Sequence, residues 1–129
     1  MRPLAGLCAA LLLCACQGDA QDGFGDAATT WQLVTLDGAA FDATATLTFP
    51  EAGRIAGSAP CNQYFGPMNS TFPGFSAPAL AATRRACPAL EDEIRFLAAL
   101  RAVTRAERAD DALILSDETG ARLVFRRAD

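Results

Sequence analysis

Apolar and polar residues alternate in several short segments of the chain, which is the pattern of strands that bury one face. Residues 29–37 place Trp31 and Leu33 on one face, and residues 44–49 and 122–126 alternate in the same way. We therefore expect antiparallel strands with one side packed on a core.

Two pairs of these segments are joined by short turns that end in glycine. Residues 50–53 join 44–49 to 54–58, and residues 117–120 join two segments near the end of the chain. Both are predicted hairpins, because glycine readily adopts a left-handed backbone. Glycine and proline recur through residues 62–82, which favours short strands and bulges over a helix.

One segment has the helical period. Pro88 suits a first helical turn, and three consecutive acidic residues follow it where the helix dipole favours negative charge. Leu90, Ile94 and Leu97 form the predicted apolar stripe, and the helix should end near Ala102. The order of elements predicts a mainly β domain of α+β class in which the helix packs on the sheet.

The N-terminus reads as a targeting segment. Arg2 precedes an apolar run that is too short to span a bilayer. The stretch from Leu13 through Ala15 to Cys16 resembles a bacterial lipobox, which implies that residues 1–15 are a signal peptide and that Cys16 carries the lipid. An ordinary signal peptide or a plain hydrophobic anchor is the alternative.

The chain is then expected to divide into three parts. Residues 16–28 would form the lipidated cysteine and a flexible tether, since they are rich in Gly, Asp and Gln. Residues 29–127 would form one folded domain, with no room for a second. Gln17 follows Cys16 where Asp would favour retention in the inner membrane, so we expect a cell-envelope protein anchored in the outer membrane and facing the periplasm.

Composition narrows the chemistry. The chain has no His, which excludes His-based nucleophiles and His-ligated metals. Its net charge is -4 and it has no run of arginines, which argues against nucleic-acid binding. We expect no metal, no cofactor and no enzymatic activity, and we expect a monomer.

Cys61 and Cys87 are the two cysteines left after signal-peptide cleavage and lipidation of Cys16. In an oxidising compartment they are expected to form a disulfide, worth roughly 3.5 kcal/mol by loop-closure entropy. Two buried free thiols, or a reactive pair beside Arg84 and Arg85, are the alternatives.

Two sequence elements resemble the META domain family, which includes the HslJ-type heat-shock lipoproteins. They are Cys-Asn-x-Tyr-x-Gly at residues 61–66 and Ala-Thr-Arg-x-Ala-Cys-Pro at residues 82–88. The resemblance covers residues 29–127, with departures at Pro60, where Gly is usual, and at Arg85, where Met is frequent. It implies a small antiparallel, partly open β-barrel with one inserted helix. It also implies an envelope lipoprotein linked in some members to heat shock and antibiotic tolerance, and it brings no catalytic residues.

Four side chains in these elements are candidate binding residues. Asn62 and Tyr64 could form a ligand site beside the cysteines, although a turn and core packing are the simpler interpretation. Thr83 and Arg84 could bind an anionic group, although such an arginine more often pairs with a carboxylate of its own domain.

Three functional hypotheses follow. The first is a non-enzymatic envelope lipoprotein that binds an apolar molecule or a protein partner. The second is a pilot-like or chaperone-like interaction module for an envelope assembly, which would use an exposed strand edge or apolar patch. The third is an enzyme using carboxylates or the Cys61 and Cys87 pair. A hollow interior would favour a ligand carrier, and a packed one would move the function to the surface.

Overall fold

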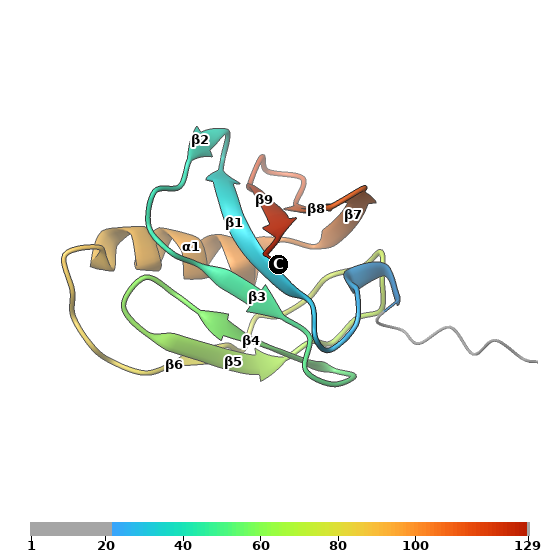
Figure 1. Cartoon of the computed structure of the whole chain (residues 1–129), viewed down its shortest axis with the longest axis horizontal. Coiled ribbons are helices and arrows are strands. Elements are labelled where there is room, and N and C mark those ends of the chain that lie inside the picture. Colours follow the sequence, from blue (N-terminus) through green and yellow to red (C-terminus); the bar gives the residue numbers. More distant parts are fainter. Residues whose placement is uncertain (1–21, 129) are drawn as a thin grey trace, which may run out of the picture.

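The computed structural model describes residues 22–128 of the chain (Figure 1). The predicted signal peptide at residues 1–15 and the predicted lipid attachment site at Cys16 lie outside the described residues. No helix in the described part is long and apolar enough to cross a membrane.

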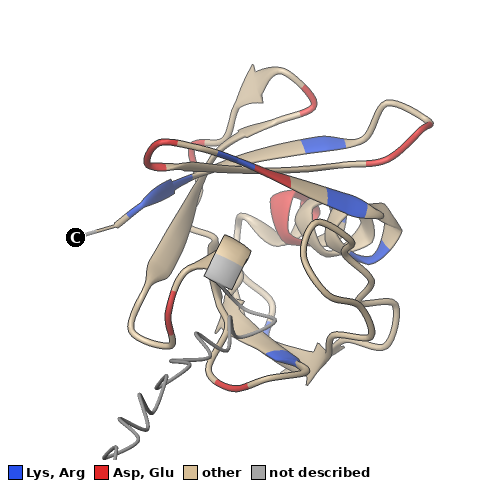
Figure 2. Cartoon of the chain, turned by 90° about the vertical axis from the view of Figure 1, so that its right-hand side faces the viewer, with Lys and Arg blue, Asp and Glu red and all other residues tan. Residues whose placement is uncertain are grey.

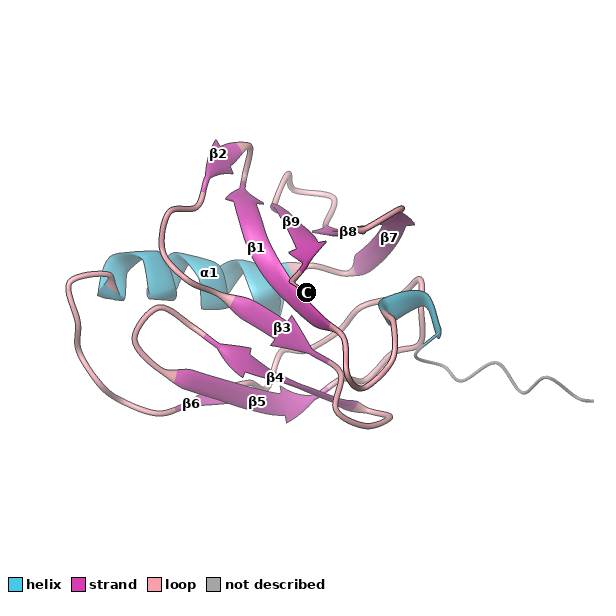
Figure 3. Cartoon of the chain, in the orientation of Figure 1, coloured by secondary structure: helices cyan, strands magenta, loops and turns pink. Residues whose placement is uncertain are grey.

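The elements follow the order strands, helix, strands (Figure 3). Their bounds are η1 Asp22–Phe24, β1 Thr30–Leu36, β2 Ala39–Ala40, β3 Thr46–Thr48, β4 Arg54–Ser58, β5 Gln63–Pro67, β6 Ala81–Ala82, α1 Leu90–Ala102, β7 Arg105–Ala109, β8 Ala112–Ser116 and β9 Arg122–Arg127.

Within residues 22–128, nine strands form a single sheet, and every pairing in it is antiparallel. The order is β6-β5-β4-β3-β1-β9-β8-β7, with β2 paired to β1. The two predicted hairpins are confirmed as β3–β4 and β8–β9. Strand β1 joins the two halves: Trp31 pairs with Leu47 on β3, and Leu33 pairs with Phe125 on β9.

The mainly antiparallel sheet with one helix is therefore confirmed, but closure into a barrel is not, because β6 and β7 do not pair. Helix α1 occupies the space between the β4–β5–β6 end and the β7–β8–β9 end of the sheet (Figure 2). The Arg101 guanidinium donates to the Leu80 carbonyl at 3.1 Å, beside β6. At the opposite end of the sheet, β7 contacts the loop between β5 and β6: the Ala106 amide donates to the Pro73 carbonyl at 2.7 Å.

Large side chains fill the interior. The alternating residues of the sequence face inward as expected, and Trp31, Leu47 and Phe125 are all fully buried. Phe96 of α1 packs its ring edge-on against Tyr64, with centroids 5.6 Å apart, and against Phe125 at 6.5 Å. This aromatic contact ties the helix to both halves of the sheet.

The buried face of α1 differs from the predicted stripe. Ile94, expected inside, is 60% exposed, whereas Phe96, Leu97, Leu100 and the acidic Glu93 are buried. The spacing of apolar residues alone does not set the orientation of the helix. Glu93 faces inward because it accepts hydrogen bonds from buried donors, and Phe96 faces inward because its side chain has more apolar surface to bury than that of Ile94.

The predicted tether at residues 16–28 is wrong at its C-terminal end. Phe24 is only 1% exposed and stacks on Phe49 with ring centroids 4.4 Å apart. The Trp31 indole N–H donates to the Phe24 carbonyl at 2.7 Å. At Gly23 a Cβ atom would lie 2.1 Å from the Phe72 ring, so this position has no space for a side chain. The folded part thus begins by residue 22, because one aromatic side chain in a polar segment suffices to dock it.

Replacing Phe24 tests this boundary. Phe24→Ala should lower the free energy of unfolding by about 3–5 kcal/mol, since it removes a ring from the packed core. Phe65→Ala is the matched control, because Phe65 is 46% exposed, and its effect should stay below about 1 kcal/mol. Urea denaturation measures both, and equal effects would contradict docking of the segment.

Candidate functional site

The two sequence elements with the cysteines meet beside the N-terminal end of α1. Cys61 lies in the turn between β4 and β5, and Cys87 lies just before α1. The two residues form a disulfide with their Cα atoms 5.6 Å apart. The bond links the β4–β5 turn to the segment 83–87, which follows β6.

Asn62 forms the centre of this junction. Its side-chain Nδ2 donates to the Arg85 carbonyl at 2.9 Å and to Oε2 of Glu93 at 2.6 Å. Its Oδ1 accepts from the Arg85 amide at 2.6 Å and from the Thr83 hydroxyl at 2.9 Å. The buried amide therefore uses both of its donors and accepts two bonds, so it has no capacity left for a ligand.

Glu93 is the buried acceptor on the helix. It is 4% exposed, and its second carboxylate oxygen accepts from the Cys61 backbone amide at 3.0 Å. Glu93 lies in the first turn of α1, where the helix dipole also favours negative charge. Two hydrogen bonds and the dipole stabilise this carboxylate, which has no basic side chain within 4 Å in the described part of the chain.

Thr83 and Tyr64 are likewise engaged internally. The Thr83 hydroxyl accepts from the Gln63 amide at 3.1 Å while it donates to Asn62. The Tyr64 hydroxyl donates to the Thr46 carbonyl, and burial raises the pKa of Tyr64 well above its ordinary value. The phenol therefore stays protonated. It lies against Gly57, where a Cβ atom would be 2.7 Å from the hydroxyl, so glycine makes room for it.

For three of the four candidate binding residues, this geometry fits a structural role in the turn and the core better than ligand binding. Asn62, Thr83 and Tyr64 lie close together, but their polar atoms bond to the domain itself. Arg84, the fourth candidate, is exposed on the surface.

Sequence reasoning missed two residues here. In the sequence Glu93 is one of three acids at a helix start, and only its buried position shows its role. Arg85 departs from the family pattern, but nothing in the sequence marks it as a site residue.

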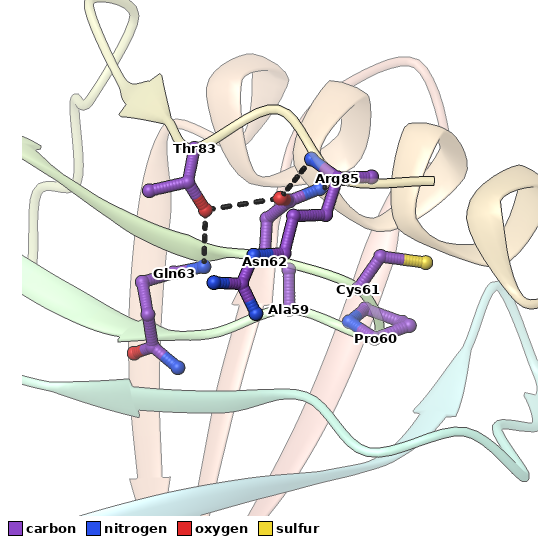
Figure 4. Close-up of a pocket in the computed structure, with 7 residues that line it drawn as sticks. All are labelled: Ala59, Pro60, Cys61, Asn62, Gln63, Thr83 and Arg85. Carbon is purple, nitrogen blue, oxygen red and sulfur yellow. Dashed lines mark hydrogen bonds between the residues drawn. The ribbon is translucent and has the colours of Figure 1, made fainter. Parts of the chain in front are cut away.

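Arg85 forms a wall shared by two open surface depressions. The first has a volume of about 340 Å³ and is lined by Ala59, Pro60, Cys61, Asn62, Gln63, Thr83 and Arg85 (Figure 4). The second, of about 320 Å³, is lined by Asn62, Thr83, Arg84, Arg85, Ala86, Leu90 and Glu93. We call them the Arg85 depression and the Glu93 depression.

The described residues contain no group of three His, Cys, Asp or Glu side chains placed to hold a metal ion. The chemistry that the junction offers to a ligand is therefore that of its exposed arginines and small polar groups.

These features define the class of the protein: a small, mainly β domain with one helix and a disulfide-linked, hydrogen-bonded junction. The META domain profile matches residues 26–129, and the chain belongs to the META domain family. No curated protein matches it.

Solved structures share the fold. A protein from Burkholderia xenovorans, solved by NMR, is 29% identical with a TM-score of 0.65, over 84% of this chain and 87% of that one. A DUF4847 family protein from Bacteroides vulgatus, solved by crystallography, has a TM-score of 0.68 at 15% identity. That match covers 86% of this chain and 100% of the other, and it shows the fold alone.

Substituting Glu93 tests the junction. Glu93→Gln should lower the free energy of unfolding by about 1–3 kcal/mol, because the new amide group would face a donor that now has an acceptor. Glu91→Gln is the control: Glu91 is exposed in the same turn, and its loss should cost less than about 1 kcal/mol. Denaturant unfolding at neutral pH measures the difference. Equal costs would show that the buried bonds of Glu93 add nothing.

Proposed function

We propose that this META domain protein is a non-enzymatic lipoprotein of the bacterial cell envelope, anchored through Cys16, that acts by binding a protein partner. The lipobox-like stretch ending at Cys16 and the apolar segment before it support the anchoring. The absence of His from the sequence and the internal use of the polar groups at the junction support a binding role over catalysis.

The filled interior is the observation that favours a protein partner over an apolar small molecule. Trp31, Tyr64 and Phe96 occupy the space that a carrier would keep open, and each is at most 1% exposed. The depressions beside Arg85 are open at the surface, and the surface that lines the Arg85 depression is mainly polar. A buried apolar ligand would therefore have to displace core side chains at considerable cost.

Strand addition at a sheet edge is less favourable than binding on a face. Strand β6 is only two residues long, and the Pro73–Gly74 segment already bonds to the outer edge of β7. A partner strand would find few unpaired backbone groups at either edge.

The outer face of β5 offers a better surface. Phe65 is 46% exposed. It borders a depression of about 210 Å³ with Pro67, Ala79 and Ala81. Gln63 lies two residues before Phe65 on the same face of the strand and also lines the Arg85 depression. We call this surface the Phe65 face. Arg54 lines the same depression as Phe65, and an exposed aromatic ring near an arginine is typical of the centre of a protein interface.

The anchor would keep the folded domain close to the membrane. Six residue steps separate Cys16 from Asp22, which at full extension span no more than about 22 Å. The partner is thus expected among proteins of the same membrane or of the adjoining periplasm. The family resemblance to heat-shock lipoproteins makes an envelope assembly engaged under stress a suitable candidate.

Photo-crosslinking in cells tests the partner proposal. A benzoylphenylalanine residue in place of Phe65 should form a discrete adduct with another envelope protein, before or after heat shock. The same residue in place of Ile94 is the control, since Ile94 is 60% exposed on α1. No adduct from position 65, or identical adducts from both positions, would contradict the Phe65 face as the binding surface.

Palmitate labelling tests the anchor. The unsubstituted chain should incorporate labelled palmitate, and Cys16→Ser should abolish the label because it removes the thiol that the lipid requires. Cys14→Ser is the control and should retain the label, since Cys14 precedes the expected cleavage site. Labelling of Cys16→Ser would rule out this attachment site.

A further inference from the structure

The position of Arg85 is set by its backbone. Asn62 accepts a hydrogen bond from the Arg85 amide and donates one to the Arg85 carbonyl. Both peptide groups of this residue are thereby held, while its side chain is exposed and extends over the Arg85 depression (Figure 4). Within residues 22–128, no hydrogen bond or ion pair engages the Arg85 guanidinium. The backbone of Arg85 is thus held in place, while its guanidinium forms no hydrogen bond or ion pair with the described residues and is free to bind a ligand.

The two depressions beside Arg85 differ in charge. The Arg85 depression has no carboxylate in its lining, whereas the Glu93 depression includes the buried Glu93 carboxylate. An anion in the Glu93 depression would approach that negative charge, and one in the Arg85 depression would meet the guanidinium first. The Arg85 depression is therefore the more favourable place for an anionic group. Arg84 lines only the other one.

Most of the backbone amides around the Arg85 depression are already in use. Gln63 donates to the Thr83 hydroxyl, Cys61 to Glu93, and Thr83 to the Gln63 carbonyl. The Ala59 amide donates to the Asn62 carbonyl. Phosphate sites commonly rely on several free backbone amides. Here the guanidinium is the main donor that remains, and its planar fork matches a carboxylate.

We propose that the Arg85 depression binds a carboxylate of the protein partner, with Arg85 as the two-donor group and Asn62 as the residue that positions it. This inference rests on the proposed protein partner and specifies its chemistry. The partner segment would place an apolar side chain on Phe65 and an acidic side chain on Arg85, since Gln63 borders both surfaces. The net negative charge of the chain repels an acidic segment. Binding of such a segment would therefore depend on the local positive charge of Arg85.

The test uses the full-length protein as processed by cells, purified in a nonionic detergent. The probe is the acetylated and amidated tripeptide Glu-Leu-Glu, with Gln-Leu-Gln as its neutral counterpart. Binding is followed by NMR at the arginine Nε–H signals and at the backbone amides of Gln63 and Thr83. We expect saturable shifts with the acidic peptide only.

Charge-matched variants locate the binding. Arg85→Gln should raise the dissociation constant of the acidic peptide about tenfold, the loss expected for one charge-assisted contact. Arg84→Gln removes the same charge one residue away and should have a smaller effect. Arg122→Gln, on the exposed side of β9, should have none. Arg85→Lys keeps the charge but loses the fork, so it should restore binding only in part.

Several outcomes would overturn the inference. No saturable shift with the acidic peptide would do so, and so would equal losses for Arg85→Gln and Arg122→Gln. Inorganic phosphate that binds more tightly than the acidic peptide would show a phosphate site instead. If the acidic peptide does not bind but the crosslink from position 65 persists, the carboxylate site fails and the protein partner stands. If that crosslink is absent, the proposed function fails whatever the peptide does.

Discussion

The hydrogen bond between the Asn62 side chain and the buried Glu93 carboxylate, 2.6 Å long, is the interaction on which the helix position depends. The sheet is open between β6 and β7, and α1 fills the space between its two ends. A buried carboxylate without a basic partner is tolerated only where donors meet it, and Asn62 and the Cys61 amide supply them. The rotation of α1 follows: Glu93, Phe96 and Leu100 face inward and Ile94 faces solvent.

The same junction decides which residues are left for binding. Asn62 and Thr83 use their polar atoms within the domain, and Tyr64 has its hydroxyl satisfied inside. Polar residues that bond only to each other stabilise a surface segment without presenting it to a ligand. What they hold in place is Arg85, whose backbone bonds to Asn62 at both peptide groups while its side chain is exposed. The junction therefore supports the surface instead of forming the binding site directly.

A second cluster organises the start of the folded part. The Trp31 ring is fully buried, with the Arg108 guanidinium 4.8 Å and the Arg127 guanidinium 5.7 Å from its centroid. The Arg108 side chain donates to the Gly23 carbonyl, as the Trp31 indole does to Phe24. Cation–π contact and hydrogen bonds thus dock the N-terminal segment against β1 and β7. With this segment docked, the stretch that could act as a tether is shorter than its composition indicates.

The sequence by itself determined strands β1, β3, β4, β8 and β9, the two hairpins, the extent of the helix and the resemblance to the META domain family. Alternation, turn glycines and the Cys-Asn-x-Tyr element are local patterns, and local patterns report on the burial of one face. Only the tertiary structure decided that the sheet stays open, that Phe24 belongs to the core and that Glu93 is buried. It also decided that Arg85 extends an exposed side chain at an acid-free depression, whereas Thr83 and Asn62, which line the same depression, bond within the domain. Each of these depends on contacts between residues far apart in the chain, such as Asn62 and Glu93. The spacing of hydrophobic residues does not reveal that a polar side chain can be buried because a distant residue provides its hydrogen bond.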